Sequence, residues 1–188
     1  LTLDVNIPSV IIQDISIIGN HCFDIDIDIT STDINNITSF FINNNKLSIS
    51  LEIDYNCTTF FQTSCSVNNN IMQYIKWTLT SVNSANDIRG MMISNNNCQR
   101  GIEIFCNDNL LADSQISDNL VDHRISPLNR PFRLYIAATD ILNCKITDNV
   151  YAERGSSQIS EILASTITLS TITGNIINSS FNITGSLI

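Results

Sequence analysis

The 188-residue sequence has few charged residues, six glycines and three prolines. Charged residues make up only 14% of it, and nine basic residues stand against 18 acidic ones, for a formal charge of −9. The chain therefore lacks the clustered lysines and arginines that neutralise phosphates, and we expect no nucleic-acid partner. No apolar run approaches the roughly 18 residues of a membrane span, so we expect no membrane span either.

The sequence also lacks a CxxC pair and a histidine at zinc-ligand spacing, which argues against structural zinc. An even number of cysteines in an acidic chain rich in Asn and Thr suits an oxidising compartment, although small buried thiols are the alternative. The disulfide candidates are Cys22, Cys57, Cys65, Cys98, Cys106 and Cys144, and sequence alone does not choose their pairing. Four sequons make Asn36, Asn56, Asn178 and Asn182 candidates for glycosylation.

What the chain does contain is a repeat, in which an aliphatic residue is followed three positions later by Asn, with Gly, Asn or Asp directly before that Asn. The repeat asparagines are Asn20, Asn45, Asn70, Asn96, Asn119, Asn149 and Asn175. Their successive spacings are 25, 25, 26, 23, 30 and 26 residues. A second column, eight residues before each Asn, is aliphatic in every repeat except the one with Gln62. A period of this length predicts a solenoid.

The residues around each repeat asparagine predict a bend between two strands. Gly, Asn and Asp tolerate a positive φ, so we expect a tight bend just before every repeat Asn. Apolar residues then alternate, as in Phe23–Ile29, Leu47–Ile53 and Ile75–Leu79, which indicates strands with one buried face and places Trp77 in the inward phase. Residues 158–164 are the only candidate for a helix.

A strand, a bend and a second strand repeated about every 25 residues resemble the right-handed parallel β-helix of the pectin-lyase-like superfamily. The resemblance covers nearly the whole chain and implies one all-β domain over residues 1–188, with about seven coils of ~25 residues. Equivalent asparagines would then stack about 4.8 Å apart and form a hydrogen-bonded ladder. An antiparallel β-sandwich, the alternative, would not keep the bend chemistry at a fixed phase.

The run Phe23–Ile29 places three aspartates on an outward strand face. Our alignment of successive coils predicts that Asp28 lies beside Glu52, and that Asp26 lies in a row with Ser50 and Lys76. Like charges about 5 Å apart either raise a carboxyl pKa or bind a cation such as Ca²⁺. Asp26, Asp28 and Glu52 are therefore candidate Ca²⁺ ligands, and we expect no other cofactor. Alternatively, these acids are solvated residues that keep the solenoid soluble.

The longest repeat carries its extra residues between Asp122 and Arg133. Insertions in solenoids form loops on one face, which is often the binding face. Asp122-His123 and the spacing from Arg124 through Pro127 to Arg130 are similar to the Asp-His and Arg-x-Pro-x-x-Arg motifs of pectate lyases, with one residue too many in the second. If the chain is an enzyme, the resemblance implies Asp122, His123, Arg124, Arg130 and Arg133 as catalytic candidates. Alternatively, the arginines pair with local aspartates on a structural loop.

The near-constant repeat length leaves little chain from which to build a cleft, so we expect a structural protein and not an enzyme. Neither end of the sequence shows an amphipathic cap, and we expect another subunit or the rest of a longer solenoid to cover the ends. The sequence thus predicts a self-assembling subunit of an extracellular fibre, sheath, envelope layer or virion surface, packed end-on or laterally as a homo-oligomer or polymer. The alternatives are a carbohydrate-active β-helix, which is either a lyase-like enzyme or a glycan-binding domain for a polysaccharide, and an adhesin passenger domain.

Overall fold

The computed structural model describes residues 1–6, 11–80, 87–122, 134–152, 160–177 and 181–187, apart from the side chains of 31–36, 57–61, 107–108, 122, 152 and 187. Every regular element in these residues is a β-strand, and the strands join in one 19-stranded sheet. The helix candidate at 158–164 is wrong where the chain is described, because β16 (Ser160–Thr168) is a strand whose inward residues pack in the core.

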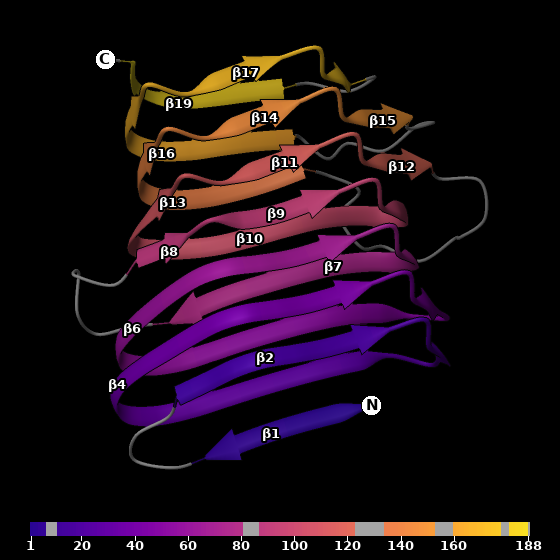
Figure 1. Ribbon diagram of the computed structural model, residues 1–188. Coiled ribbons are helices and arrows are strands. Elements are labelled where there is room, and N and C mark those ends of the chain that lie inside the picture. The colour runs from indigo at the N-terminus through magenta and orange to yellow at the C-terminus, as the bar shows by residue number, and fades with distance from the viewer. Residues whose placement is uncertain (7–10, 81–86, 123–133, 153–159, 178–180, 188) are drawn as a thin grey trace.

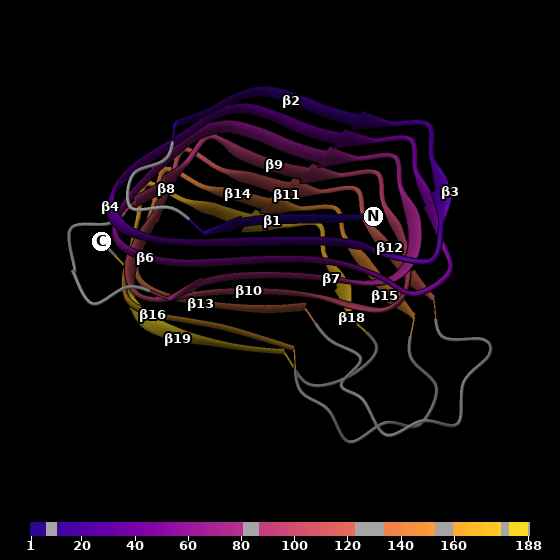
Figure 2. The ribbon, with the colours of Figure 1, turned by 90° about the horizontal axis from the view of Figure 1, so that it is seen from below.

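The sheet winds around one axis as a right-handed solenoid (Figures 1 and 2). Its front sheet contains β2 (Ile11–Ile18), β8 (Asp87–Arg89), β9 (Met91–Ser94), β11 (Gln115–Ser117), β14 (Lys145–Thr147) and β17 (Thr171–Thr173). Its back sheet contains β1 (Thr2–Asn6), β7 (Ile71–Thr80), most of β13 (Leu134–Leu142) and β16, and β19 (Phe181–Leu187). The longest strands, β4 (Ile25–Asn43), β6 (Ser50–Asn68) and β10 (Asn97–Ala112), run along the back sheet and turn into the front one. Short strands close the right side, namely β3 (His21–Cys22), β5 (Lys46–Leu47), β12 (Leu120–Asp122), β15 (Val150–Ala152) and β18 (Ile176–Ile177).

Each strand pairs in parallel with the equivalent strand of the next coil, in all pairings of the described residues. This confirms the parallel β-solenoid and excludes the antiparallel sandwich. The solenoid has about five turns, fewer than the seven coils predicted.

Two columns of bends with positive φ turn the chain in every repeat. The first column lies directly before the repeat asparagines, as predicted, and consists of Gly19, Asn44, Asn69, Asn95, Asp118, Asp148 and Gly174. The second lies five residues earlier and consists of Asp14, Ser39, Ser64, Gly90, Asp113, Asn143 and Leu169. Sequence reasoning missed the second column, because serine and leucine carry no strong signal for a left-handed conformation.

The repeat asparagines form a ladder, and those in the interior coils use every hydrogen-bonding group of their side chains. Asn70 donates from its backbone N–H and from Nδ2 to Oδ1 of Asn96, at 3.0 Å in both cases, and from Nδ2 to the Ile42 carbonyl at 2.8 Å. Its own Oδ1 accepts from the N–H and Nδ2 of Asn45, at 2.8 and 3.0 Å. Both amide donors and both acceptor positions are thus occupied. In the same way, Nδ2 of each repeat asparagine donates to Oδ1 of the next one, from Asn20 through to Asn175.

The core between the sheets is built from aliphatic columns. The column eight residues before each Asn is buried throughout, from Ile12 to Ile167, as the sequence predicted. Trp77 is also fully buried, and its ring meets that of Tyr55 edge to face at a centroid distance of 6.1 Å. Gln62 is the exception in its column, because its side chain is 0% exposed and neither amide atom has a hydrogen-bond partner among the described residues.

We predict that Gln62→Leu stabilises the protein. A buried amide without partners costs its desolvation free energy, so its removal should raise the free energy of unfolding by about 1–3 kcal/mol. Urea denaturation measures the change as a higher midpoint. Gln73→Leu is the matched control, because Gln73 Nε2 donates to the Ser48 carbonyl at 2.9 Å near the surface, and its loss should bring no gain. A lower midpoint for Gln62→Leu would contradict the prediction.

We also predict that Asn96→Ala is strongly destabilising. It leaves the N–H and Nδ2 of Asn70 without an acceptor, and it removes the Nδ2 donor from Oδ1 of Asn119 and from the Val67 carbonyl, all at buried residues. The expected loss is at least about 2 kcal/mol in the free energy of unfolding, from the same urea titration. Asn97→Ala removes the neighbouring exposed amide and should change stability by less than about 0.5 kcal/mol. Equal losses in the two variants would refute a structural role for the ladder.

Candidate functional site

The outward face of the back sheet carries a cluster of acids, which we call the acidic face: Asp4, Asp26, Asp28, Glu52 and Asp54 on its first three strands, and Asp24 directly before β4. Asp28 aligns with Asp4 on one side and with Asp54 on the other. Asp26 aligns with Glu52, and Glu52 aligns with Lys76. The acids therefore form two parallel rows along the solenoid axis.

These pairings correct the register that we predicted for Asp28 and Glu52. The prediction placed Ile25 beside Ile49, but the structure pairs Ile25 with Leu51. Ile49 lies in the bend before β6, where its N–H donates to the Phe23 carbonyl at 2.8 Å. Because Ile49 belongs to the corner, the strand of the second coil pairs with β4 two residues further along than we predicted.

Lys76 balances part of the negative charge of the acidic face, and Tyr74 donates a hydrogen bond to it. Lys76 Nζ lies 3.5 Å from Asp54 Oδ1 and 3.9 Å from Glu52 Oε2. The Tyr74 hydroxyl donates to Oε1 of Glu52. Partial burial, together with the charges of Glu52 and the neighbouring aspartates, raises the pKa of Asp26 above its usual value. The carboxylates of the acidic face therefore repel one another in the folded protein.

The three proposed Ca²⁺ ligands share this face, but they do not converge. Asp26 and Glu52 lie in one row and Asp28 lies in the other. Within the described part of the chain, no group of three or more His, Cys, Asp or Glu side chains is arranged to hold a metal ion. Ca²⁺ binding stays a prediction that this geometry does not favour.

The candidate catalytic residues of the long repeat are not brought together in the described structure. Asp122 is the last residue of β12, and its side chain is not described. His123, Arg124, Arg130 and Arg133 lie outside the described residues. The structure places only the two ends of this segment, at β12 and β13.

The described cysteines carry free thiols, and most of them belong to the core. Cys65, Cys98, Cys106 and Cys144 are buried, whereas Cys22 is half-buried. Burial raises the pKa of the Cys65, Cys98 and Cys106 thiols to about 12 and that of Cys144 to about 11. Only the backbone of Cys57 is described. The alternative interpretation, small thiols packed in a core, thus describes four of the six cysteines.

The sequon asparagines differ in how far the structure describes them. Asn56 and Asn182 are exposed on the outward face of the back sheet. The side chain of Asn36 and the whole of Asn178 lie outside the described residues. Two of the four glycosylation candidates are therefore accessible to a modifying enzyme.

The outermost strands leave core columns partly uncovered at both ends of the described solenoid. In the row that contains Ile27, Ile53 and Trp77, which are all 0% exposed, the last residue Ile183 is 44% exposed. At the other end, Leu3, Val5 and Ile15 are only partly buried. The outer edges of β1 and β19 therefore combine backbone groups that face no further strand with apolar side chains.

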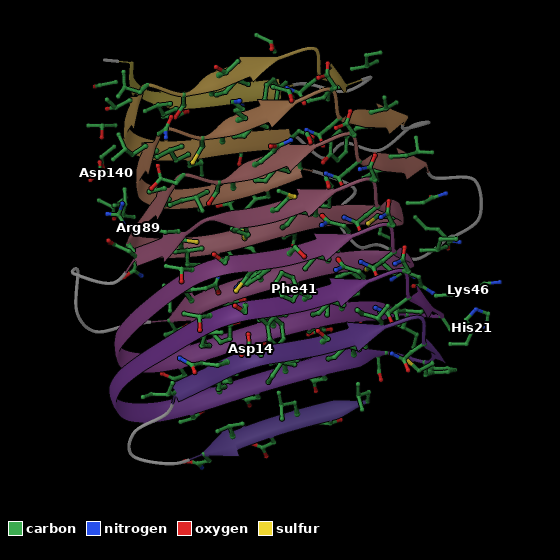
Figure 3. All side chains as sticks on the ribbon, in the orientation of Figure 1. Asp14, His21, Phe41, Lys46, Arg89 and Asp140 are labelled. Carbon is green, nitrogen blue, oxygen red and sulfur yellow. The ribbon has the colours of Figure 1, made fainter. Side chains whose placement is uncertain are left out.

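An open pocket on the right side of the molecule was not expected from the sequence. It has a volume of about 230 Å³ and is lined by His21, Cys22, Phe23, Lys46 and Ser48. Figure 3 shows His21 and Lys46 projecting side by side from this edge. A signal was present in principle, because His21 and Lys46 both follow a repeat asparagine directly.

Comparison with known proteins adds no functional assignment. No protein-family model, curated protein or solved structure matches this chain. None of the described residues forms a helix with the length and apolar character needed to cross a membrane.

We predict that Asp26→Asn stabilises the protein at neutral pH and low salt. Because the native pKa of Asp26 is raised, the folded state binds its proton more tightly than the unfolded state does. The free energy of unfolding therefore falls as pH rises from the unfolded-state pKa of this carboxyl through its native pKa. Asp26 is exposed, so we expect a gain of only a few tenths of a kcal/mol.

The gain should disappear below about pH 3, where the wild-type carboxyl is also neutral, and should shrink in 1 M salt. Thermal unfolding at three pH values measures it. Asp118→Asn is the control, since other repeats carry Asn at this bend. A gain that is the same at every pH and salt concentration would show that charge repulsion is not its cause.

Proposed function

We propose that this protein is a structural β-solenoid that assembles with further copies of itself into an extracellular fibre, sheath, envelope layer or virion surface. The observation that carries the proposal is the continuous order along the axis. Backbone pairing, the asparagine ladder and the aliphatic columns repeat from coil to coil, so each coil is a template for the next. Stability in such a protein is a sum over neighbouring coils.

The edges of β1 and β19 support end-on assembly. They belong to the same sheet and share its rows, so a second copy would place Thr2 beside Asn182 and Leu3 beside Ile183. β19 contains no charged residue and no proline, the devices that natural proteins use to block edge pairing. A head-to-tail contact of this kind is heterologous and builds an open polymer.

The contact would be made through the back sheet alone. The described solenoid has its outermost strands, β1 and β19, on the back sheet. Pairing β19 with β1 of a second copy would therefore hold β17 and that copy's β2 about two strand spacings apart, roughly 10 Å. The apolar pair Ile183 and Leu3 then supplies the centre of the contact.

Two surface features support an extracellular, cell-surface or virion-surface location. The chain is strongly acidic, with a formal charge of −9, which favours solubility and disfavours non-specific binding to anionic polymers. Asn56 and Asn182 carry sequons on exposed, outward positions. In this proposal the protein is not an enzyme and needs no cofactor.

A second candidate function is glycan binding by the outward face of the back sheet. The rings of Phe105 and Tyr135 lie 5.0 Å apart on that face, and Glu103 and Glu161 flank Tyr135 in its row. Aromatic faces bordered by hydrogen-bond acceptors suit a neutral polysaccharide. Loss of binding to a glycan array in Tyr135→Ala, with folding unchanged, would favour this candidate over assembly.

We predict that the protein forms polymers whose growth depends on β19. Ile183→Lys places a charge at the centre of the proposed contact, and should raise the concentration needed for assembly at least about tenfold. Ile71→Lys is the matched control, because Ile71 is similarly exposed, 48% against 44%, but lies on the side of the solenoid. Light scattering over a concentration series, with negative-stain microscopy, measures both variants.

Leu3→Lys should block the opposite end. A mixture of Ile183→Lys and Leu3→Lys should then form dimers and nothing larger, because each variant keeps one intact end. A stronger effect of Ile71→Lys than of Ile183→Lys would indicate lateral packing. Wild-type protein that stays monomeric at all concentrations would refute self-assembly.

A further inference from the structure

The pocket beside the first bend brings together a thiol, an imidazole, an ammonium group and an aromatic ring. β3 and β5 build it by pairing in parallel, with His21 beside Lys46 and Cys22 beside Leu47. Phe23 continues the wall and is 67% exposed. Its volume of about 230 Å³ lies below that of pockets that enclose a drug-sized ligand, so it suits one end of a small molecule and not a folded partner.

Cys22 differs from the other described thiols because of its place in the stack. It begins an inward column that continues through Leu47, Met72, Cys98 and Val121. Those four residues are at most 4% exposed, since coils cover them on both sides. Cys22 belongs to the first coil, is only half-buried and lines the pocket. Among the described cysteines, Cys22 is therefore the one that a reagent in the pocket can approach.

The rim of the pocket carries the positive charge of Lys46 in a protein that is negatively charged overall. Lys46 and His21 are both exposed, and neither takes part in an ion pair among the described residues. The Lys46 charge attracts a reagent that carries carboxylates.

We propose that Cys22 is a site of thiol–disulfide exchange with small disulfides that carry carboxylate groups. The Cys22 thiolate attacks one sulfur of the disulfide, a new S–S bond to Cys22 forms and the original S–S bond breaks. The second sulfur leaves as a thiolate and takes up the proton that Cys22 released. The incoming disulfide is itself the oxidant, so the step needs no further reagent.

The test uses the intact, folded protein with two disulfides of opposite charge. Glutathione disulfide carries carboxylates, and cystamine carries only amines. Mass spectrometry of peptides from quenched samples locates each adduct and separates Cys22 from Cys57. We expect the Cys22 peptide to be modified at least about tenfold faster than the peptides of Cys65, Cys98, Cys106 and Cys144.

A pair of lysine variants tests the role of the rim. Lys46→Gln should slow the reaction with glutathione disulfide about two- to fivefold and should not slow that with cystamine. Lys145→Gln is the matched control, because Lys145 is also exposed but lies on β14, and it should change neither rate. Both lysines are on the surface, so both variants should fold.

Three results would overturn the proposal: modification of Cys22 no faster than that of the buried thiols, equal effects of Lys46→Gln on the two reagents, or a Cys22-linked dimer in place of the small adduct. The proposal does not rest on self-assembly. The reaction is measured at concentrations below those that produce polymers, so failure of one proposal leaves the other standing.

Discussion

The structure depends on one constraint, which is that buried amide groups in each bend must find their partners in the next coil. The side chain of each interior asparagine uses two donors and two acceptor positions, and its partners belong to the coils above and below. This requirement holds the bend at one phase whatever happens elsewhere in the coil. Asn119 and Asn149, which are 30 residues apart, still bond at 2.9 Å, and Asn96 and Asn119, which are only 23 apart, bond at 3.0 Å. The number of residues in a coil therefore does not change the phase of the ladder.

Once the bends are in phase, the two faces of each sheet acquire different chemistry. Inward residues stack into aliphatic columns, which absorb cysteines, a tryptophan and one unsatisfied glutamine. Outward residues stack into rows, so that like side chains in successive coils become neighbours. That stacking turns scattered aspartates into the acidic face and makes Lys76 the only cation that reaches Glu52 and Asp54 among the described ion pairs. The same geometry that stabilises the core thus concentrates charge on the surface.

A solenoid of this kind has two kinds of surface, its sides and its ends, and they suit different functions. The sides carry charge, the Cys22 pocket and the outward rings of Phe105 and Tyr135. The ends carry strand edges and residues of the core rows such as Ile183, whose equivalents in the interior coils are fully buried. We attribute assembly to the ends and small-molecule chemistry to a side pocket, because each follows from the groups that are present there.

The sequence by itself determined the parallel solenoid, the bend before each Asn, the ladder and the inward column from Ile12 to Ile167, because each of these recurs in every coil. Only the tertiary structure decided the register of Asp26 with Glu52, since that depends on how many residues the corner around Ile49 takes up. It also revealed the second column of bends, where serine and leucine adopt positive φ because the stacked coils hold them there. The exposure of Cys22 beside the burial of Cys98 likewise depends on whether a coil lies on each side, which no local pattern records.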